Sequence, residues 1–326
     1  MRRLALALAL CLTAAAAPAF ADFPEAVRDH ILPGYAGFAA ATAALDAEAQ
    51  ADCSPQRLRP AFQAAWDAWM AVAHLRLGPV EDHGRVLAIA FWPDPKGLGA
   101  KAQMALLTGD PAALTPEHFP EQSVAARGLT GLERLLYPAE PLPADPCALI
   151  RATTADLARM AGEIDAAWQG GYADVLLTAG EPGNTTFLSR PEVRQALFTQ
   201  LAAGLEFVED SRLGRPLGTF DKPRPERAEA RASGRSLRNV TLGLQAMKGL
   251  VQALTPDAPQ TVAAFDHAIA LAEAMDDPAF AGVAEPQSRL KVEILAEAVD
   301  EIRAVILSEL APELDVGIGF NAADGD

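Results

Sequence analysis

The chain has 326 residues, of which half are hydrophobic, and it carries a formal net charge of −16. This length allows one large domain or two smaller ones, and the hydrophobic share is ample for a core. The strongly acidic balance argues against a nucleic-acid partner, because such proteins need a basic surface. It would suit a cationic ligand, although a high charge of one sign is more often a means to solubility.

The first 21 residues have the pattern of a secretory signal peptide. Arg2 and Arg3 precede a short apolar run over residues 4–17, and Ala19-Phe20-Ala21 fits the A-x-A cleavage pattern. The run is too short for a membrane anchor, and no long apolar run follows it. We therefore expect cleavage after Ala21, a mature chain without a transmembrane segment, and a periplasmic location.

Two cysteines remain after this cleavage, Cys53 and Cys147. An exported chain enters an oxidising compartment, where an even pair of cysteines tends to form a disulfide. Metal ligation by the two thiols is the alternative, but a single pair at this spacing gives it little support. We expect a disulfide that joins the start of one helix to the start of another.

The hydrophobic pattern is helical nearly throughout. Phe62, Trp66, Trp69, Ala73 and Leu77 follow the three-four spacing of an amphipathic helix, and similar stripes recur along the chain. Runs with the two-residue alternation of strands are missing, so no sheet is expected. The pattern predicts helices near 24–49, 55–77, 84–92, 99–108, 121–137, 146–169, 190–212, 227–254, 258–275 and 287–311.

The segment 170–189 is rich in glycine and lacks an apolar stripe, which is typical of a linker or long loop. Helices of this length without a sheet pack best as antiparallel bundles. We therefore predict an all-α fold of two helical-bundle halves packed together. The N-terminal bundle would cover 22–175, the C-terminal bundle 176–312 and a loose tail 313–326.

Two short segments in the predicted halves resemble each other. The run from Leu75 to Pro79 and the run from Ser211 to Pro216 both place Arg-Leu-Gly at the end of a predicted helix. The similarity could mark a duplicated four-helix-bundle unit, or it could be a chance match of a few residues.

A first candidate site lies on the predicted helix 121–137. Thr130 and Glu133 are three residues apart and share a helix face, so a carboxylate there could bind a cation or act as an acid or base. The alternative is an exposed glutamate paired with a neighbouring arginine. Gly128 and Gly131 favour the site, because glycine costs a helix about 1 kcal/mol against alanine and suggests close approach by another group.

Arg76, Trp92 and Asp94 form a second group of candidates. Arg76 falls on the last predicted turn of the tryptophan-bearing helix, where a cation is favourable in any case. It could instead form a forked pair with Glu133 or Asp94. Trp92 could line a pocket or fill the core, and Asp94 follows it in a turn that ends a helix.

A third group stands in the second half, at Ser233, Arg235 and Ser236. Ser236 could cap the helix that begins there. Arg235, the two hydroxyls and Asn239 could instead bind an anion at the helix start. The histidines form no H-E-x-x-H pair, and no nucleophile or phosphate-loop motif is present.

Four blocks in this order resemble the imelysin family. They run from Trp66 to Pro79, from Arg85 to Asp94, from Gly128 to Tyr137 and from Ser233 to Leu237. Imelysins are exported bacterial proteins, catalogued by some as metallopeptidases and often associated with iron acquisition. The resemblance covers nearly the whole mature chain and implies an all-helical fold of two bundle-like halves with a site between them.

The resemblance also implies a metal site, but one residue departs from the pattern. The family hallmark is G-x-H-x-x-E on a helix, and here Thr130 stands in the place of the histidine. This removes the best transition-metal ligand, and catalytic zinc sites use three protein ligands. The change speaks against peptidase activity and leaves Glu133 as the one predicted metal ligand. His74 or His83 could supply the missing imidazole.

These observations predict a periplasmic imelysin-like protein that binds iron or an iron-containing species in iron uptake or handling. The cofactor would be iron or another divalent metal, and the partner a periplasmic or outer-membrane iron-uptake protein. Two alternatives stay open, a metallopeptidase that uses Glu133 and a non-catalytic docking protein, and the lost histidine favours the non-enzymatic readings. The expected ligand-binding residues are Arg76, Trp92, Asp94, Thr130, Glu133, Ser233, Arg235 and Ser236.

Overall fold

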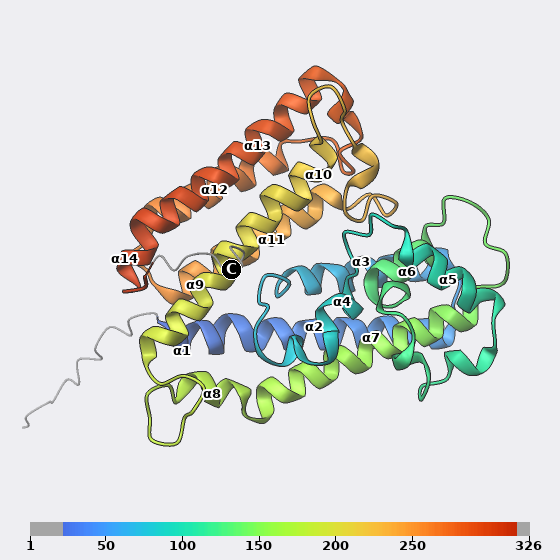
Figure 1. Ribbon diagram of the computed structural model, residues 1–326, viewed down its shortest axis with the longest axis horizontal. Helices are drawn as coiled ribbons and strands as arrows, with labels where there is room; N and C mark the ends of the chain where they lie inside the picture. Colours follow the sequence, from blue (N-terminus) through green and yellow to red (C-terminus); the bar gives the residue numbers. More distant parts are fainter. Residues whose placement is uncertain (1–21, 318–326) are drawn as a thin grey trace, which may run out of the picture.

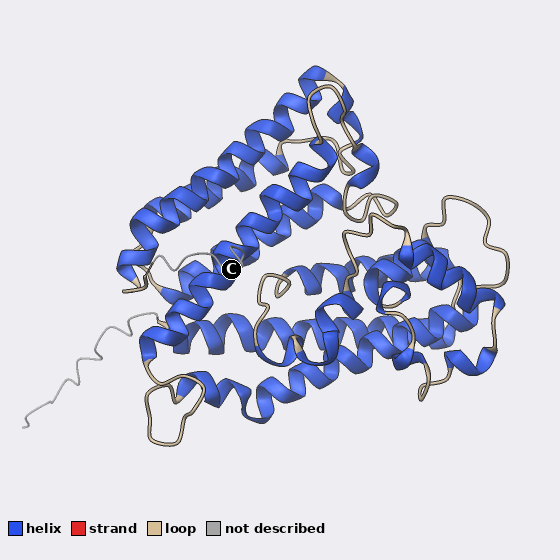
Figure 2. Ribbon diagram, viewed as in Figure 1, coloured by secondary structure: helices blue, strands red, loops and turns tan. Residues whose placement is uncertain are grey.

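The computed structural model describes residues 22–317, so the predicted signal peptide and the end of the tail lie outside the described residues. Within this range the chain is helical and contains no strand, apart from one isolated bridge between Thr219 and Lys222 (Figure 2). The all-α prediction is confirmed. None of the helices between residues 22 and 317 is long and apolar enough to cross a membrane.

The first half is built around one long helix at the start of the chain. Helix α2 packs against α3 and α7, and the shorter helices close one end of this group (Figure 1). Its core contains Phe38, Phe62, Trp66 and Trp168, all fully buried. The elements are α1 (Phe23–Glu25), η1 (Ala26–Ile31), α2 (Leu32–Ala51), α3 (Pro55–Met70), α4 (Arg85–Ile89), α5 (Leu98–Thr108), α6 (Gly128–Leu136), α7 (Cys147–Ala167) and α8 (Ala173–Leu177).

The second half consists of four long helices that run side by side, with α11 packed against α12 and α12 against α13 (Figure 1). A π-helical segment, η8 (Phe207–Leu213), continues the first of them, α9. The helices are α9 (Arg190–Glu206), α10 (Gly214–Leu217), α11 (Ser236–Leu254), α12 (Pro259–Glu273), α13 (Pro286–Val305) and α14 (Ala311–Glu313). The chain thus forms two helical halves, and the predicted boundary after residue 175 falls inside α8.

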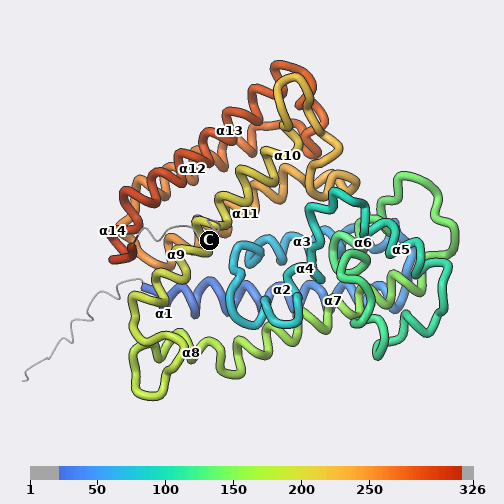
Figure 3. The backbone as a smooth tube through the Cα atoms, in the orientation of Figure 1, coloured from blue at the N-terminus to red at the C-terminus, as the bar shows by residue number. Residues whose placement is uncertain are grey.

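The two halves pack together along α11 and α9. Helix α11 contacts α3, α1 and η1 of the first half, so the beginning of the chain lies beside its later part (Figure 3). Side chains from the C-terminal end of α3 and from η8 meet at this interface.

The predicted disulfide between Cys53 and Cys147 is present. It connects the turn between α2 and α3 to the first residue of α7. Because 94 residues separate the two cysteines, the bond removes much conformational freedom from the unfolded chain, worth about 4.7 kcal/mol in the loop-closure model.

One helix prediction was wrong at its end. Helix α3 ends at Met70, not near residue 77, and the following turns are held by tertiary contacts. The hydroxyl of Tyr35 donates to the carbonyl of Leu75 at 3.0 Å, and the side chain of Gln200 accepts from the backbone N–H of Arg76 at 2.8 Å. These bonds replace helical ones, so Arg76 lies beyond the helix.

Two further helices begin later than predicted. Helix α6 begins at Gly128, whose φ of +63° breaks the helical path. A Cβ atom at this residue would lie 2.1 Å from the carbonyl oxygen of Ala88, so the close approach inferred from the glycines is made by the backbone of α4. Helix α11 begins at Ser236, not near 227, because residues before it form a loop in which Ala230 and Gly234 have positive φ.

Candidate functional site

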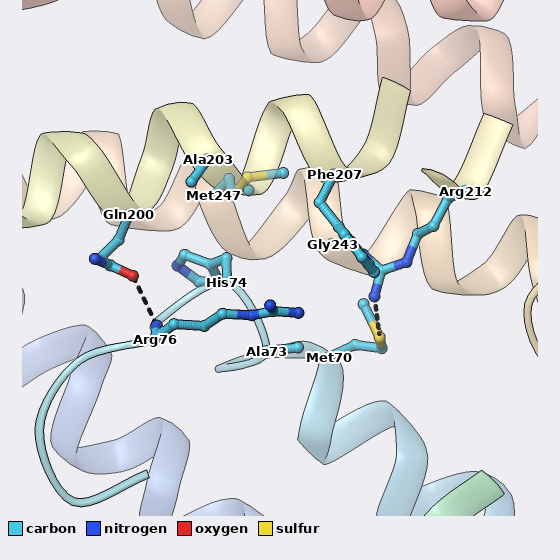
Figure 4. Close-up of a pocket in the computed structure, with 11 residues that line it drawn as sticks. Met70, Ala73, His74, Arg76, Gln200, Ala203, Phe207, Arg212, Gly243 and Met247 are labelled. Carbon is cyan, nitrogen blue, oxygen red and sulfur yellow. Dashed lines mark hydrogen bonds between the residues drawn. The ribbon is translucent and has the colours of Figure 1, made fainter. Parts of the chain in front are cut away.

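A cavity of about 260 Å³ lies between the two halves. The turns after α3 contribute Ala73, His74 and Arg76, and Met70 ends the helix before them (Figure 4). The second half contributes the remaining lining residues, Gln200, Ala203, Gly204, Phe207, Arg212, Gly243 and Met247. The lining therefore combines apolar surface with two guanidinium groups and one imidazole.

The π-helical segment η8 positions two of these side chains. Phe207 is its first residue and Arg212 its sixth, and the wider turn of a π-helix, which is frequent at functional sites, aims both at the cavity. The Nε of Arg212 donates to Glu229 at 2.7 Å, and its Nη2 contacts the sulfur of Met70 at 3.6 Å. Arg212 is therefore a buried cation with one carboxylate partner.

Arg76 reaches the same ring from the first half. Its guanidinium carbon lies 5.1 Å from the centre of the Phe207 ring, and that of Arg212 lies 5.0 Å from the same centre. Among the described residues no carboxylate forms an ion pair with Arg76, which Glu81 and Glu229 influence only at longer range. Burial lowers the pKa of Arg76, and the charge of Arg212 lowers it further.

His74 lines the same cavity beside Arg76. Its ring is buried, and neither ring nitrogen has a hydrogen-bond partner among residues 22–317. The ring of His30 lies 5.6 Å away, centre to centre. Burial lowers the pKa of His74 well below its usual value, with further lowering from His30 and Arg212, so this imidazole is neutral at pH 7. A neutral imidazole offers one donor and one acceptor to a ligand.

Trp92 supports the cavity wall from behind. Its ring meets the Phe207 ring edge to face at 5.8 Å, and the guanidinium of Arg215 lies 5.9 Å from its centre. Trp92 thus contacts a lining residue without lining the cavity itself.

Glu133 and Ser233 join the two halves at a second place. One carboxylate oxygen of Glu133 accepts from both the backbone N–H and the hydroxyl of Ser233, at 2.8 and 2.7 Å. Glu133 is buried, and this burial raises its pKa, while the bonds from Ser233 act in the opposite direction. The alternative of an exposed glutamate is wrong, since Arg127 pairs with Asp156 and Arg134 with the Gln103 side chain.

Thr130 and Asp94 bind backbone groups of the first half. The hydroxyl of Thr130 accepts from the N–H of Phe91 at 3.1 Å. The two oxygens of Asp94 accept from the N–H groups of Leu98 and Gly99, both at 2.8 Å, at the start of α5. The forked pair suggested for Arg76 therefore does not form. Asp94 binds the start of α5, and Glu133 binds Ser233.

Arg235 is buried at the interface, and three side chains accept hydrogen bonds from its guanidinium. Its guanidinium donates to Asp67 and Asn239, both at 2.8 Å, and to the side chain of Gln63. The hydroxyl of Ser236 donates to the carbonyl of Glu229 and makes no helix cap. Four of the five N–H donors of Arg235 are therefore already used, which argues against an anion site at the start of α11.

The donors around Glu133 do not fit a metal ion. Thr130 and Ser233 offer only hydroxyls, and both already take part in hydrogen bonds. Over residues 22–317, no group of three or more His, Cys, Asp or Glu side chains could hold a metal. His74 lies in the cavity beside His30, and His83 stands on an exposed turn, so neither restores the missing ligand.

A chain of hydrogen bonds connects Arg235, at the start of α11, to the cavity. Asn239 holds Arg235 through one side-chain atom and donates to Glu229 through the other, at 2.9 Å. Glu229 in turn holds Arg212, which lines the cavity. Of the eight predicted ligand-binding residues, Arg76 alone lines this cavity. Trp92 packs behind it, Thr130 and Asp94 bind backbone groups within the first half, and the others lie at the junction between the halves.

The sequence-based prediction missed His74 as a lining residue, together with Phe207, Arg212 and Met247. One signal was available, because the repeated Arg-Leu-Gly segments contain Arg76 and Arg212. The two arginines of that repeat approach the same phenylalanine from opposite halves.

Comparisons with known proteins agree with this architecture. The family model described as imelysin, Peptidase_M75, matches residues 31–306. An imelysin-like protein from Psychrobacter arcticum 273-4 has a similar structure, with a TM-score of 0.77 and 23% identity over 91% of this chain and 98% of that one. A second similar structure is that of a Parabacteroides distasonis ATCC 8503 protein, named as an iron-regulated protein A precursor. Its TM-score is 0.65, and its sequence identity is 13% over 90% of this chain and 96% of that one.

At these identities the two solved structures inform on the fold alone. A search of curated proteins gave no match. The family model covers most of the chain, including both halves and the cavity between them. This chain therefore belongs to the imelysin family.

Proposed function

We propose that this protein is an exported binding protein of iron uptake or handling, with its ligand site in the cavity between the two helical halves. The observation that carries the proposal is the buried imidazole of His74, which lines that cavity together with two arginines. Neither ring nitrogen of His74 has a hydrogen-bond partner among residues 22–317, and the exposed residue Arg76 forms no ion pair within the same range. Buried polar groups in a native fold are nearly always hydrogen-bonded, so exceptions in a cavity favour a ligand.

Three further features support an exported, iron-linked role. The N-terminal pattern fits a signal peptide, and the disulfide between Cys53 and Cys147 suits the periplasm. The name of the Parabacteroides distasonis relative refers to iron regulation. Since the donors at Glu133 do not fit a metal, we expect the iron to arrive already chelated.

The test is a binding titration of the mature chain with ferric citrate, ferric and ferrous iron, haem and copper. We expect one equivalent of an iron-containing species per chain. The variant Ala73→Leu fills the cavity and should abolish this binding, whereas Ala263→Leu, on the exposed face of α12, should leave it unchanged. Absence of binding to every iron species, or equal binding by both variants, would refute the proposal.

A further inference from the structure

We propose that the inter-half cavity binds a small organic carboxylate, with its charged end between Arg76 and Arg212 and its apolar body against Phe207 and Met247. The inference rests on the proposed function and specifies the chemical class of the ligand. It follows from four properties of the lining, which are its charge, its free donors, its apolar surface and its size.

The charge of the cavity selects an anion. Arg76 and Arg212 both approach Phe207, and the Glu229 carboxylate that pairs with Arg212 balances only one of them. The chain as a whole is strongly acidic, with a formal charge of −16, so this local excess of positive charge runs against the general composition. An anion placed between the two guanidiniums relieves their mutual repulsion.

The free donors point the same way. Within residues 22–317, only the Nε of the Arg212 guanidinium donates to an oxygen atom, and the contact of its Nη2 with the Met70 sulfur is a weak one. The side chain of Arg76 runs from the turns after α3 toward Arg212, with the His74 ring beside it (Figure 4). A planar guanidinium binds a carboxylate through two parallel hydrogen bonds, and the neutral imidazole of His74 can donate a third.

The remaining lining distinguishes an organic anion from an inorganic one. Phe207, Met247, Met70 and the small residues beside them offer apolar surface, which a phosphate or sulfate ion leaves uncovered. A Cβ atom on Gly204 would lie 2.7 Å from the Met247 sulfur, so glycine at this position leaves room for the Met247 side chain. At about 260 Å³ the cavity lies just below the range typical of drug-sized ligands, so the occupant is small.

A soft metal ion is the competing occupant, because His74, Met70 and Met247 offer nitrogen and sulfur ligands. Two guanidiniums in the same cavity repel any cation, and Met70 already contacts Arg212. The observations therefore favour the carboxylate, and copper(I) becomes an outcome of the test.

The experiment titrates the iron-free mature chain with butyrate, succinate and inorganic phosphate at constant ionic strength, followed by calorimetry. We expect at least one carboxylate to bind once per chain, and phosphate to bind about tenfold more weakly or not at all. In Arg76→Gln the carboxylate affinity should fall about tenfold or more, since a charged hydrogen bond is lost, and Arg76→Lys should lie between the two. Arg159→Gln, on the outer face of α7, is the matched control and should bind like the parent.

Circular dichroism of each variant establishes that it is folded before it is titrated. The inference fails if neither carboxylate binds, if phosphate binds as tightly, if Arg76→Gln binds like the parent, or if copper(I) binds and excludes the carboxylates. Iron-free carboxylate binding with no iron species bound would uphold this inference and refute the iron-linked function. If ferric citrate binds to both the parent and Arg76→Gln and no free carboxylate binds, the iron-linked function is upheld and this inference is refuted.

Discussion

Two arginines at the interface between the halves have opposite surroundings. Arg235 is 1% exposed, and Asp67, Gln63 and Asn239 accept from its guanidinium. Arg76 lies over Phe207 in the cavity and has no carboxylate partner among the described residues. The first guanidinium joins the two halves, whereas the second forms no ion pair among residues 22–317, and we propose that it binds the ligand.

The comparison separates two kinds of polar residue that a motif alone does not distinguish. Both arginines belong to blocks that resemble the imelysin family, and both would pass as site residues on sequence grounds. Exposure and partners tell them apart, because Arg235 is buried and ion-paired, whereas Arg76 is exposed and forms no ion pair among the described residues. Removing a paired buried charge costs stability, whereas removing an unpaired exposed one costs little.

The largest effect is expected for Arg235→Ala. Removing the buried guanidinium takes a donor from Asn239 and from the Gln63 side chain and leaves Asp67 paired with Arg238 alone, which should lower the free energy of unfolding by about 3 kcal/mol. Urea denaturation followed by circular dichroism measures this change. Arg238→Gln is the control, since Arg238 pairs with the same Asp67 but is 56% exposed, and it should cost less than about 1 kcal/mol. Equal losses in the two variants would contradict the comparison.

The second effect concerns pH and two neighbouring histidines, His74 in the cavity and His30 beside it. Burial lowers the pKa of His30 to about 4, against an ordinary value of 6.5. Between these values the unfolded chain binds a proton that the folded chain does not, so stability falls as the pH decreases from about 6.5 toward 4. From pH 7 to pH 5 the loss from His30 alone is about 2 kcal/mol.

His74 acts in the same direction, while Glu133, with its raised pKa, opposes both because its folded form takes up a proton more readily. Urea unfolding at several pH values should show a shallower decline in His30→Gln than in the parent. The same substitution at the exposed His267 should leave the decline unchanged, and a flat profile in the parent would show that the buried imidazoles do not titrate as argued.

A smaller effect is expected at the second junction between the halves. Ser233→Ala removes the hydroxyl donor to Glu133 but keeps the backbone N–H at 2.8 Å. One lost hydrogen bond to a charged group should lower the free energy of unfolding by about 1–2 kcal/mol. The variant should also raise the pKa of Glu133 further, which a titration of stability against pH can detect. A loss as large as that of Arg235→Ala would mean that Ser233 does more than hold Glu133.

Much of the fold follows from local sequence pattern. The three-four spacing around Trp66 predicts α3, and the two cysteines of an exported chain predict the disulfide. Gly128 signals a close approach before the partner is known, and the partner proves to be the backbone of α4. These features depend on neighbours in sequence or on chemistry that is independent of the fold.

The site could be predicted only in part, because its lining depends on how the halves meet. The end of α3 at Met70 is set by bonds from Tyr35 and Gln200, which lie far away in sequence. No periodicity reveals that Phe207 would lie between two arginines, or that His74 would be left without partners. The family-like blocks pointed to Arg76 and to the junction at Glu133, but burial and partner counts need coordinates.

The smallest effect, and the sharpest contrast with Arg235, is expected for Arg76→Gln in the ligand-free protein. This guanidinium has no ion pair to lose, and its removal relieves the repulsion with Arg212 that lowers its pKa. The free energy of unfolding should therefore change by less than about 0.5 kcal/mol in either direction. The same urea denaturation measures it, beside Arg235→Ala. A loss of several kcal/mol would mean that Arg76 has a structural partner in solution, and the distinction between a satisfied and an available guanidinium would no longer hold.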